Sequence, residues 1–533
     1  MNFNINQINC TMKKLLLFTS LLLCSVCSAQ VRIDWQQSYG SLDNDYAVSI
    51  IEAEDGFLML GKVDTDINAG MFDCNAMYRA NWLVKIDNGQ QLVRQDCFSV
   101  GLFSHLLKGT NGHYYMVELG DNGSMIWNLR IKQLNEEANV LWNKSYGTSY
   151  GLAEVAGNTF AITSFDGGVV VATEFLGADG DISQEFGEKD CWVVKIDDEG
   201  NIVWETTLGT GSDDFVFSLQ NANDGGYYVG LTSEQQGNGN IGCGQPENDG
   251  VIVKLDADGQ VQWSRCYPQI QVCNMIELED GFLLAGERQL VVDPQSNCED
   301  GIYSYDCCLL KCDVEGNIEW RKDYGGSCSD RMVKVFRSEA GGYTVFANSK
   351  SSDGDVASAA NLGVTDYEKG NIWVLHVNSG GNLLWERCIG SGIGLLESVW
   401  DVIEVGENEY VLLGESEWFE GVSSGDVNCS NNIILPESKN NIWVLQITDT
   451  FDYDEITETS KEKVFVHPSP TTGFVRIEGK MASAVQVFNA LGQLVKTVQN
   501  TNEVTLEGMP QGVYLLRVTL EDGKVFSEKV VKE

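Results

Sequence analysis

The chain has 533 residues, of which 43% are hydrophobic and 21% are charged, so it can bury a sizeable core and is not disordered throughout. Asp and Glu number 77 against 35 Lys and Arg, which gives a formal net charge of −42. Nucleic acids and anionic membranes bind positively charged surfaces, so this excess of negative charge excludes them as partners.

Residues 1–29 have the pattern of a signal peptide. Lys13 and Lys14 precede the apolar run 15–23, and small residues before Gln30 form a cleavage site. This run is too short to span a bilayer, and no later stretch is long and apolar enough to do so. The sequence therefore predicts an exported protein without a transmembrane segment.

The cysteines agree with export to an oxidising compartment. Three of the 16 lie in the predicted signal peptide, which leaves 13 and therefore at least one unpaired thiol. We expect most of the others to form disulfides. Cys74 with Cys97 and Cys243 with Cys266 have the same spacing and similar flanking sequences, so we predict these two bridges. The pairing within the cluster 298–328 stays open, and the lack of a C-x-x-C pair or a nearby histidine argues against zinc there.

The middle of the chain repeats one pattern: an apolar strand, a turn containing Asp and Gly, and a strand ending in Trp. The clearest copy is D-C-W-V-V-K-I-D-D-E-G-N-I-V-W at 190–204. Related copies lie at 251–263, 311–320 and 373–385, with weaker ones at 82–94 and 127–142. We expect the Asp to hydrogen-bond within its own turn, the Gly to adopt a positive φ and the Trp to pack in the core.

Two further strand signals lie between successive copies, joined by turns such as Asp55-Gly56 and Asp280-Gly281. Each unit is therefore predicted to be a four-stranded meander, and the units number seven. The first strand of the chain, near Trp35, occupies a fourth-strand position and should complete the last sheet. We predict an all-β protein with a seven-bladed β-propeller over 30–448, with six or eight blades as alternatives.

The composition changes after the repeats. Residues 449–463 are acidic and are predicted to be a linker, whereas 464–533 carry equal numbers of basic and acidic side chains. Nearly all the negative charge therefore lies on the predicted propeller. The C-terminal segment is predicted to be a small β-sandwich, with strands at 474–477, 484–489, 494–498, 504–506, 513–519 and 525–531.

A series of motif positions marks this segment: Pro468, Pro470, Gly473, Gly492, Pro510, Gly512, Tyr514 and Lys529. With these residues the segment resembles the C-terminal sorting domain of the type IX secretion system of Bacteroidetes. One departure is Ser469, where the family usually has Asn between the two prolines. The resemblance implies recognition by the outer-membrane secretion machinery, removal of the domain, and release or attachment at the cell surface.

No established catalytic motif is present in the sequence: it has no G-x-S-x-G, H-E-x-x-H or P-loop. Of the four histidines, His376 stands at the repeat position that Lys195 holds in the clearest copy, so we interpret it as a repeat residue and not as a base. A glycosidase needs one particular pair of carboxylates, and the sequence does not select it from so many.

Closely spaced Asp residues recur before the third strand of several units, at Asp64 and Asp66, Asp179 and Asp181, and Asp353 and Asp355. Hard oxygen ligands at this spacing are the kind that Ca²⁺ prefers. The sequence leaves two interpretations open, a calcium site and a solvated acidic turn.

Three functional hypotheses follow. The first is an exported, non-enzymatic propeller that binds glycan, matrix or protein ligands at the cell surface through its loops. The second is a secreted glycan-active hydrolase or lyase with an acidic site in the propeller funnel, which rests on fold analogy. The third is a passive structural protein of the surface.

Overall fold

The computed structural model describes residues 31–41, 44–64, 79–99, 101–121, 126–152, 158–233, 239–241, 249–291, 303–339, 341–356, 370–390, 397–418, 439–450, 465–467, 471, 473–478, 482–489, 494–520 and 525–532. Over these ranges the regular structure is all β, without a helix. The chain divides into two compact units, Met1–Thr450 and Phe451–Glu533. The predicted signal peptide, and the predicted linker beyond Thr450, lie outside the described residues.

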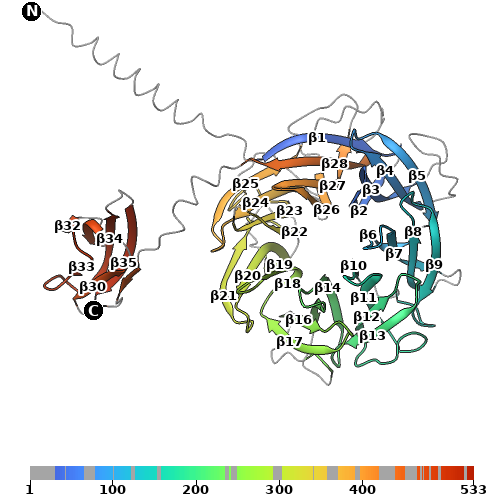
Figure 1. The fold of residues 1–533 in the computed structure, drawn as a ribbon, viewed down its shortest axis with the longest axis horizontal. Helices are drawn as coiled ribbons and strands as arrows, with labels where there is room; N and C mark the ends of the chain where they lie inside the picture. The colour runs from blue at the N-terminus through green and yellow to red at the C-terminus, as the bar shows by residue number, and fades with distance from the viewer. Residues whose placement is uncertain are drawn as a thin grey trace, which may run out of the picture. The chain divides into compact units, whose positions relative to one another are not determined.

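The described strands of the first unit form seven four-stranded antiparallel sheets, numbered here 1 to 7 in chain order (Figure 1). Sheet 1 contains β2 (Asp45–Ala53), β3 (Gly56–Asp64), β4 (Arg79–Asp87) and β5 (Leu92–Ser99). Sheet 2 contains β6 (Leu102–Lys108), β7 (Tyr114–Asp121), β8 (Trp127–Leu134) and β9 (Val140–Tyr146). Sheet 3 contains β10 (Thr159–Thr163), β11 (Val169–Phe175), β12 (Asp190–Ile196) and β13 (Ile202–Leu208).

The remaining four sheets follow the same order. Sheet 4 contains β14 (Asp214–Asn221), β15 (Tyr227–Ser233), β16 (Asp249–Leu255) and β17 (Val261–Tyr267). Sheet 5 contains β18 (Gln271–Leu278), β19 (Gly281–Val291), β20 (Tyr303–Cys312) and β21 (Ile318–Tyr324). Sheet 6 contains β22 (Asp330–Arg337), β23 (Tyr343–Ser349), β24 (Asn371–Val377) and β25 (Leu383–Ile389). Sheet 7 contains β26 (Glu397–Gly406), β27 (Glu409–Trp418), β28 (Lys439–Asp449) and β1 (Val31–Tyr39).

The sheets are arranged around a centre, with the first strand of each lying innermost (Figure 1). Each innermost strand contacts the next one along the chain, and β26 contacts β2, so the series of sheets closes on itself. The last sheet combines both ends of the unit, because β1 pairs antiparallel with β28. This pairing confirms that the N-terminal strand completes the last sheet.

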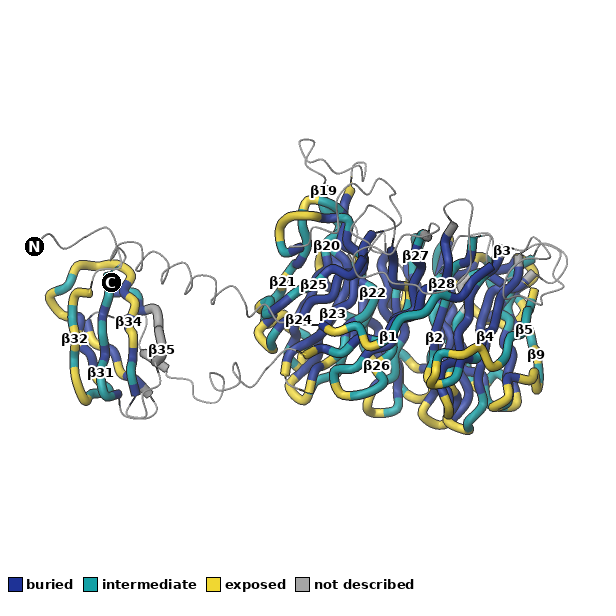
Figure 2. The backbone as a smooth tube through the Cα atoms, turned by 90° about the horizontal axis from the view of Figure 1, so that it is seen from above, coloured by how far each residue is buried: buried dark blue, intermediate teal, exposed yellow. Residues whose placement is uncertain are grey.

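The hydrophobic core lies between neighbouring sheets and follows the third strands. Trp82, Trp192, Trp373 and Trp443 occupy the same place on their strands, and each is fully buried. Figure 2 shows the strands as the buried part of the unit, with exposed residues gathered in the turns. The predicted core role of Trp192, Trp373 and Trp443 is confirmed.

The second unit contains two sheets around one core. One sheet has the order β29 (Phe465–His467), β30 (Phe474–Glu478), β33 (Glu503–Thr505). The other has the order β32 (Leu494–Gln499), β31 (Ala482–Asn489), β34 (Gly512–Leu520), β35 (Val525–Lys532). Val475 and Val504 from the first sheet pack with Val485, Leu516 and Val530 from the second. The six predicted strands are present, and β29 is an additional strand that the sequence analysis missed.

Candidate functional site

The two ends of the sheets differ in their connections. At one end, called here the turn end, short turns join first to second strands and third to fourth strands. At the other, called here the loop end, longer segments such as 65–78 and 350–370 join second to third strands. A ligand therefore meets a different kind of surface at each end.

The Asp and Gly of the repeat build the turns between third and fourth strands. Asp197 accepts a hydrogen bond from the backbone N–H of Asn201 at 2.6 Å, and Gly200 has a φ of +76°. Asp256 accepts one from the N–H of Gln260 at 2.9 Å, and Gly259 has a φ of +78°. The predicted roles of these residues in the turn are confirmed.

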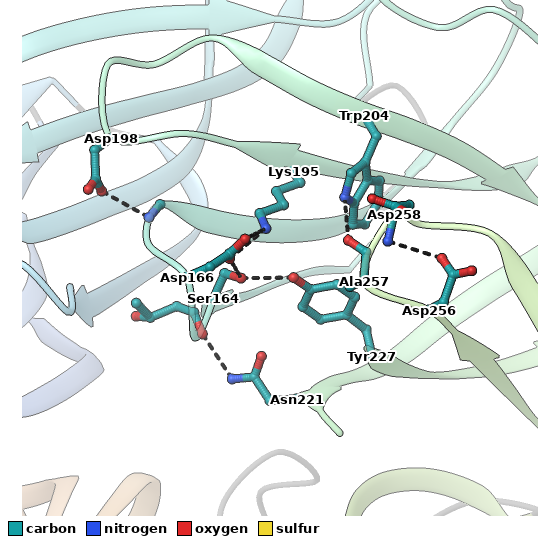
Figure 3. Close-up of polar contacts among 12 residues, drawn as sticks. Ser164, Asp166, Lys195, Asp198, Trp204, Asn221, Tyr227, Asp256, Ala257 and Asp258 are labelled. Atoms are coloured by element: carbon teal, nitrogen blue, oxygen red, sulfur yellow. Dashed lines mark hydrogen bonds and ion pairs between the residues drawn. The ribbon is translucent and has the colours of Figure 1, made fainter. Parts of the chain in front are cut away.

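The Trp of the repeat connects neighbouring sheets. The indole N–H of Trp204, at the end of sheet 3, donates to the carbonyl oxygen of Ala257 in a turn of sheet 4 at 3.0 Å (Figure 3). A Cβ at Gly259 would lie 2.4 Å from the Trp204 ring, so the turn has room only for glycine. Trp142 donates in the same way to Asp198 at 2.9 Å. The Trp of the motif therefore joins each of these sheets to the next one.

A tyrosine that ends the fourth strand adds a second hydrogen bond between sheets. Its hydroxyl donates to the carbonyl oxygen of the residue with a positive φ in the next sheet's turn. The pairs are Tyr39 with Gln90 at 2.9 Å, Tyr146 with Gly200 at 2.8 Å, Tyr267 with Gly316 at 3.3 Å and Tyr324 with Gly381 at 2.8 Å. Burial raises the pKa of all four hydroxyls, which therefore stay protonated. The tyrosine recurs in the sequence, but its partner cannot be identified there because the partner is a backbone atom of another unit.

Ion pairs at the turn end explain the repeated Lys on the third strand. The pairs are Lys85 with Asp55 at 2.8 Å, Lys195 with Asp166 at 2.5 Å, Lys254 with Asp224 at 2.8 Å and Lys311 with Asp280 at 3.1 Å. His376 takes the same register in sheet 6, where its ring lies between the Thr344 hydroxyl and the Gly341 carbonyl oxygen. Burial lowers the pKa of His376 to about 4, so the ring is neutral at pH 7.

The described Asp-x-Asp pairs lie at the loop end, against the connection from the preceding sheet. Asp179 accepts a hydrogen bond from the N–H of Ser149 at 2.8 Å, and Asp181 accepts one from Gly147 at 2.9 Å. Asp353 likewise accepts from the N–H of Ser327 at 2.7 Å. These carboxylates thus have protein donors, and among the described residues no group of three or more metal-ligating side chains gathers.

The other members of this prediction are less fully defined. Asp355 accepts a hydrogen bond from the N–H of Gly325 at 3.3 Å, which repeats the arrangement of Asp181. Asp64 ends β3, and its side chain is not described. Asp66 lies outside the described residues. The calcium interpretation stays a prediction.

The cysteines correct one expectation. Cys97, Cys266 and Cys328 are disulfide-bonded, and the predicted partners Cys74 and Cys243 lie outside the described residues. However, five others are free thiols, namely Cys191, Cys273, Cys307, Cys308 and Cys312. The expectation that most cysteines pair is wrong for these five, because all but Cys273 are buried as small apolar side chains in the strands. The neighbours Cys307 and Cys308 even belong to two different core clusters, on opposite faces of β20.

Polar groups on the innermost strands hold neighbouring sheets together. Asp401 on β26 accepts hydrogen bonds from the Ser49 hydroxyl at 3.2 Å and from the Ile50 N–H at 3.0 Å. Its other oxygen lies 3.1 Å from the Lys334 ammonium group on β22. His105 is directed at the carbonyl oxygen of Thr159, and burial lowers the pKa of its ring. Sheets 1, 6 and 7 are thereby joined through one carboxylate.

Buried carboxylates on the second strands make a related contact. Glu174 accepts a hydrogen bond from the N–H of Val216 at 3.1 Å, and Glu415 accepts one from Ala47 at 3.2 Å. Glu287 accepts one from Met332. Each donor lies beside an irregularity in the strand register of the next sheet. Burial raises the pKa of Glu174 and of Glu287 to about 7.

These carboxylates could not be predicted from the sequence, because a single acidic residue within an apolar strand carries no motif. Only the repeat register relates them to one another, since they occupy one position of the second strand. Glu174 has a cation nearby, the Lys189 ammonium group at 3.6 Å, and Glu287 has Arg331 at 3.8 Å. The arrangement suits a structural contact at the point where a backbone N–H would otherwise lack an acceptor.

In the second unit, the described motif residues stabilise the turn before β34. The Tyr514 hydroxyl donates to the carbonyl oxygen of Pro510 at 2.8 Å. These two residues and Gly512 line a hollow of about 480 Å³. The carbonyl oxygen of Gly473 accepts a hydrogen bond from the N–H of Leu506 at 2.6 Å. Lys529 lies on β35 opposite Leu515, and its side chain is not described. The predicted motif residues Pro468, Pro470 and Gly492 lie outside the described residues.

Comparison with known proteins agrees with this part of the chain. Residues 465–533 match the family model of the secretion system C-terminal sorting domain. This segment is a type IX sorting domain, and the protein is exported to the cell surface or the extracellular space. The domain implies contact with the type IX secretion machinery. In the described part of the chain, no helix has the length and apolar character needed to cross a membrane.

Two solved structures with a distant similarity to this chain illustrate the comparison. A protein of unknown function from Dyadobacter fermentans has a TM-score of 0.40 and 9% identity, covering 79% of this chain and 99% of that one. An α-L-arabinanase from Penicillium chrysogenum, complexed with arabinobiose, has a TM-score of 0.37 and 12% identity, covering 67% and 94%. No curated protein sequence matches at a significant level. Similarities this low assign neither ligand nor activity to the chain.

Proposed function

We propose that the first unit is a seven-bladed β-propeller, with sheets 1 to 7 as its blades, and that the second unit is a small β-sandwich. The closed series of innermost strands and the pairing of β1 with β28 support the propeller. The shared core of the two C-terminal sheets supports the sandwich. The boundaries 30–448 and 464–533, with a linker between them, remain part of this proposal.

The propeller, in this proposal, is a non-enzymatic binding protein for glycan, matrix or protein ligands at the cell surface. The observation that carries the proposal is that Asp401 on an innermost strand and three buried carboxylates on second strands bond to neighbouring blades. Asp401 bonds to Lys334 and to blade 1, and Glu174, Glu287 and Glu415 accept backbone N–H groups. A catalytic acid or base instead needs its proton-transferring atom directed at a substrate.

The sorting domain supports the same proposal from the other end of the chain. It delivers the protein to a place where glycans, matrix and surface proteins are the available ligands. The contacts between blades then hold the turn end as a fixed surface. A glycan-active hydrolase or lyase is the competing proposal, and a passive surface component is a further one.

The test uses the purified secreted chain on an array of glycans and matrix proteins, with calcium and with chelator. Released reducing ends are measured in parallel on the same polysaccharides. Selective binding without release supports the proposal. Release of reducing ends would overturn it in favour of the enzyme, and an array without any binding would favour the passive role.

A further inference from the structure

A groove of about 890 Å³ lies at the turn end between blades 5 and 6. Residues 278–280 and Trp320 of blade 5 and residues 337–339 and 341–343 of blade 6 line it. It lies at the opposite end of the strands from the loop end. The groove is therefore separate from the loop end and from its Asp-x-Asp pairs.

The corresponding junction between blades 3 and 4 is closed by direct contacts (Figure 3). The Tyr227 hydroxyl lies 2.8 Å from the Ser164 hydroxyl, and the Asn221 amide donates to a backbone carbonyl oxygen at 2.9 Å. The Trp204 indole donates to Ala257 at 3.0 Å. Three polar groups are thus satisfied within the protein.

The strand register identifies the residues at the same positions in blades 5 and 6. Tyr343 replaces Tyr227, Trp320 replaces Trp204, Arg337 replaces Asn221 and Leu278 replaces Ser164. Because leucine has no hydroxyl, it offers no partner to Tyr343. The longer Arg337 side chain also cannot repeat the short amide contact of Asn221.

The open junction leaves the equivalent polar groups available. Among the described residues, none forms a hydrogen bond with the Trp320 indole N–H, the Tyr343 hydroxyl or the Arg337 guanidinium group. Tyr343 is only 4% exposed, although it lines the groove. The Tyr343 hydroxyl oxygen itself is not buried, so a ligand in the groove can reach it and form a hydrogen bond with it.

The charges around the groove disfavour an anionic ligand, because four carboxylates line it against the two cationic groups of Lys311 and Arg337. Lys311 at its base is paired with Asp280 and with Glu319, each at 3.1 Å. The carboxylates of Glu279 and Glu339 disfavour an anion, and the Arg337 guanidinium group disfavours a cation. Trp320 supplies an aromatic surface with one donor, which suits a ligand with both apolar faces and hydroxyl groups.

We propose that the groove between blades 5 and 6 binds a neutral sugar unit of a glycan chain, with Trp320 against the sugar ring and Tyr343 and Arg337 hydrogen-bonded to its hydroxyl groups. This inference rests on the proposed binding function and assigns it a place and a ligand class.

The test is titration of the full secreted chain with neutral hexaoses of glucose, xylose, mannose and N-acetylglucosamine, up to about 10 mM, where weak single-site binding is measurable. Binding is followed by calorimetry and by tryptophan fluorescence. We expect one hexaose to bind, and both Tyr343→Phe and Arg337→Ala to weaken it by about five- to tenfold, the effect of one lost hydrogen bond.

Tyr227→Phe, at the closed junction, is the matched control and should bind like the unchanged chain. Trp320→Phe keeps an aromatic ring and should lose the fluorescence change. Thermal unfolding of each variant shows that it is folded. Binding that the groove variants leave unchanged would overturn the groove while leaving the proposed function intact. If no hexaose binds, the ligand class is wrong, whereas the array can still show protein or matrix binding.

Discussion

The junctions between sheets 3 and 4 and between sheets 5 and 6 are built from the same repeat but end in different surfaces. In the first, Ser164 and Asn221 complete the hydrogen bonding across the junction. In the second, Leu278 and Arg337 occupy these positions and a groove of about 890 Å³ remains. A repeat scaffold can therefore keep the contacts that hold it together and create a distinct surface by changing two side chains.

Both junctions have a glycine in the turn, and its substitution should lower the unfolding free energy more than any other change. Gly259→Ala places a Cβ 2.4 Å from the Trp204 ring at a φ of +78°, so we expect unfolding free energy to fall by about 3 kcal/mol. Gly225→Ala is the control, because its φ is +87° but no atom lies within 4 Å. The control should lose only about 1 kcal/mol in denaturant unfolding. Equal losses would show that the Trp contact contributes nothing.

Removal of a disulfide tests whether a covalent bond at the loop end contributes to the stability of the fold. Cys266 is disulfide-bonded, and Cys266→Ser should lower the unfolding free energy by about 2–3 kcal/mol. Cys273→Ser alters a free thiol near the same strand end and serves as the control. Peptide mapping without reduction should find Cys266 joined to Cys243, and a different partner would refute the predicted bridge.

Substitution of the equivalent tyrosine at each junction should affect stability differently at the closed junction and at the open one. Tyr227→Phe removes a hydrogen bond to Ser164, so we expect a loss of about 1 kcal/mol of unfolding free energy. Tyr343→Phe removes a hydroxyl without a partner in the described part of the chain, so its stability should change little. Denaturant unfolding of both variants checks the difference, and the comparison fails if the two losses are the same.

The buried Glu287 predicts a pH dependence of stability. Its pKa is raised from 4.5 to about 7, so the folded chain keeps a proton that the unfolded chain releases between these values. Unfolding free energy should therefore fall as the pH rises through this window. Glu287→Gln removes the loss and should be more stable than the unchanged chain at pH 8, by up to about 3 kcal/mol, with little difference at pH 4. The exposed Glu315→Gln is the control, and an identical pH profile for Glu287→Gln would contradict the prediction.

The Asp-x-Asp pairs give the smallest expected effect. Because Asp353 accepts the N–H of Ser327, Asp353→Ala should cost about 1 kcal/mol, in calcium and in chelator alike. Thermal unfolding under the two conditions measures this. A loss that appears only with calcium present would instead support a bound ion.

The sequence was sufficient for the repeated parts of the fold. The Asp and Gly spacing predicted the turns at Asp197 and Asp256, and the fourth-strand position of Trp35 predicted the pairing of β1 with β28. The five free thiols were not predicted. An oxidising compartment allows disulfides to form, but the fold decides which cysteines lie close enough to pair. The groove was also not predicted, because it depends on the absence of a partner for Tyr343 across two units. Such contacts are not periodic in the sequence.

Hydrogen–deuterium exchange on the full secreted chain, with and without its best-binding polysaccharide, tests the central claim most directly. The account predicts protection at 278–280, 318–321 and 337–343, and none at the equivalent segments 163–166 and 221–227 of the closed junction. Protection confined to the innermost strands around Asp401, or equal protection at both junctions, would contradict it.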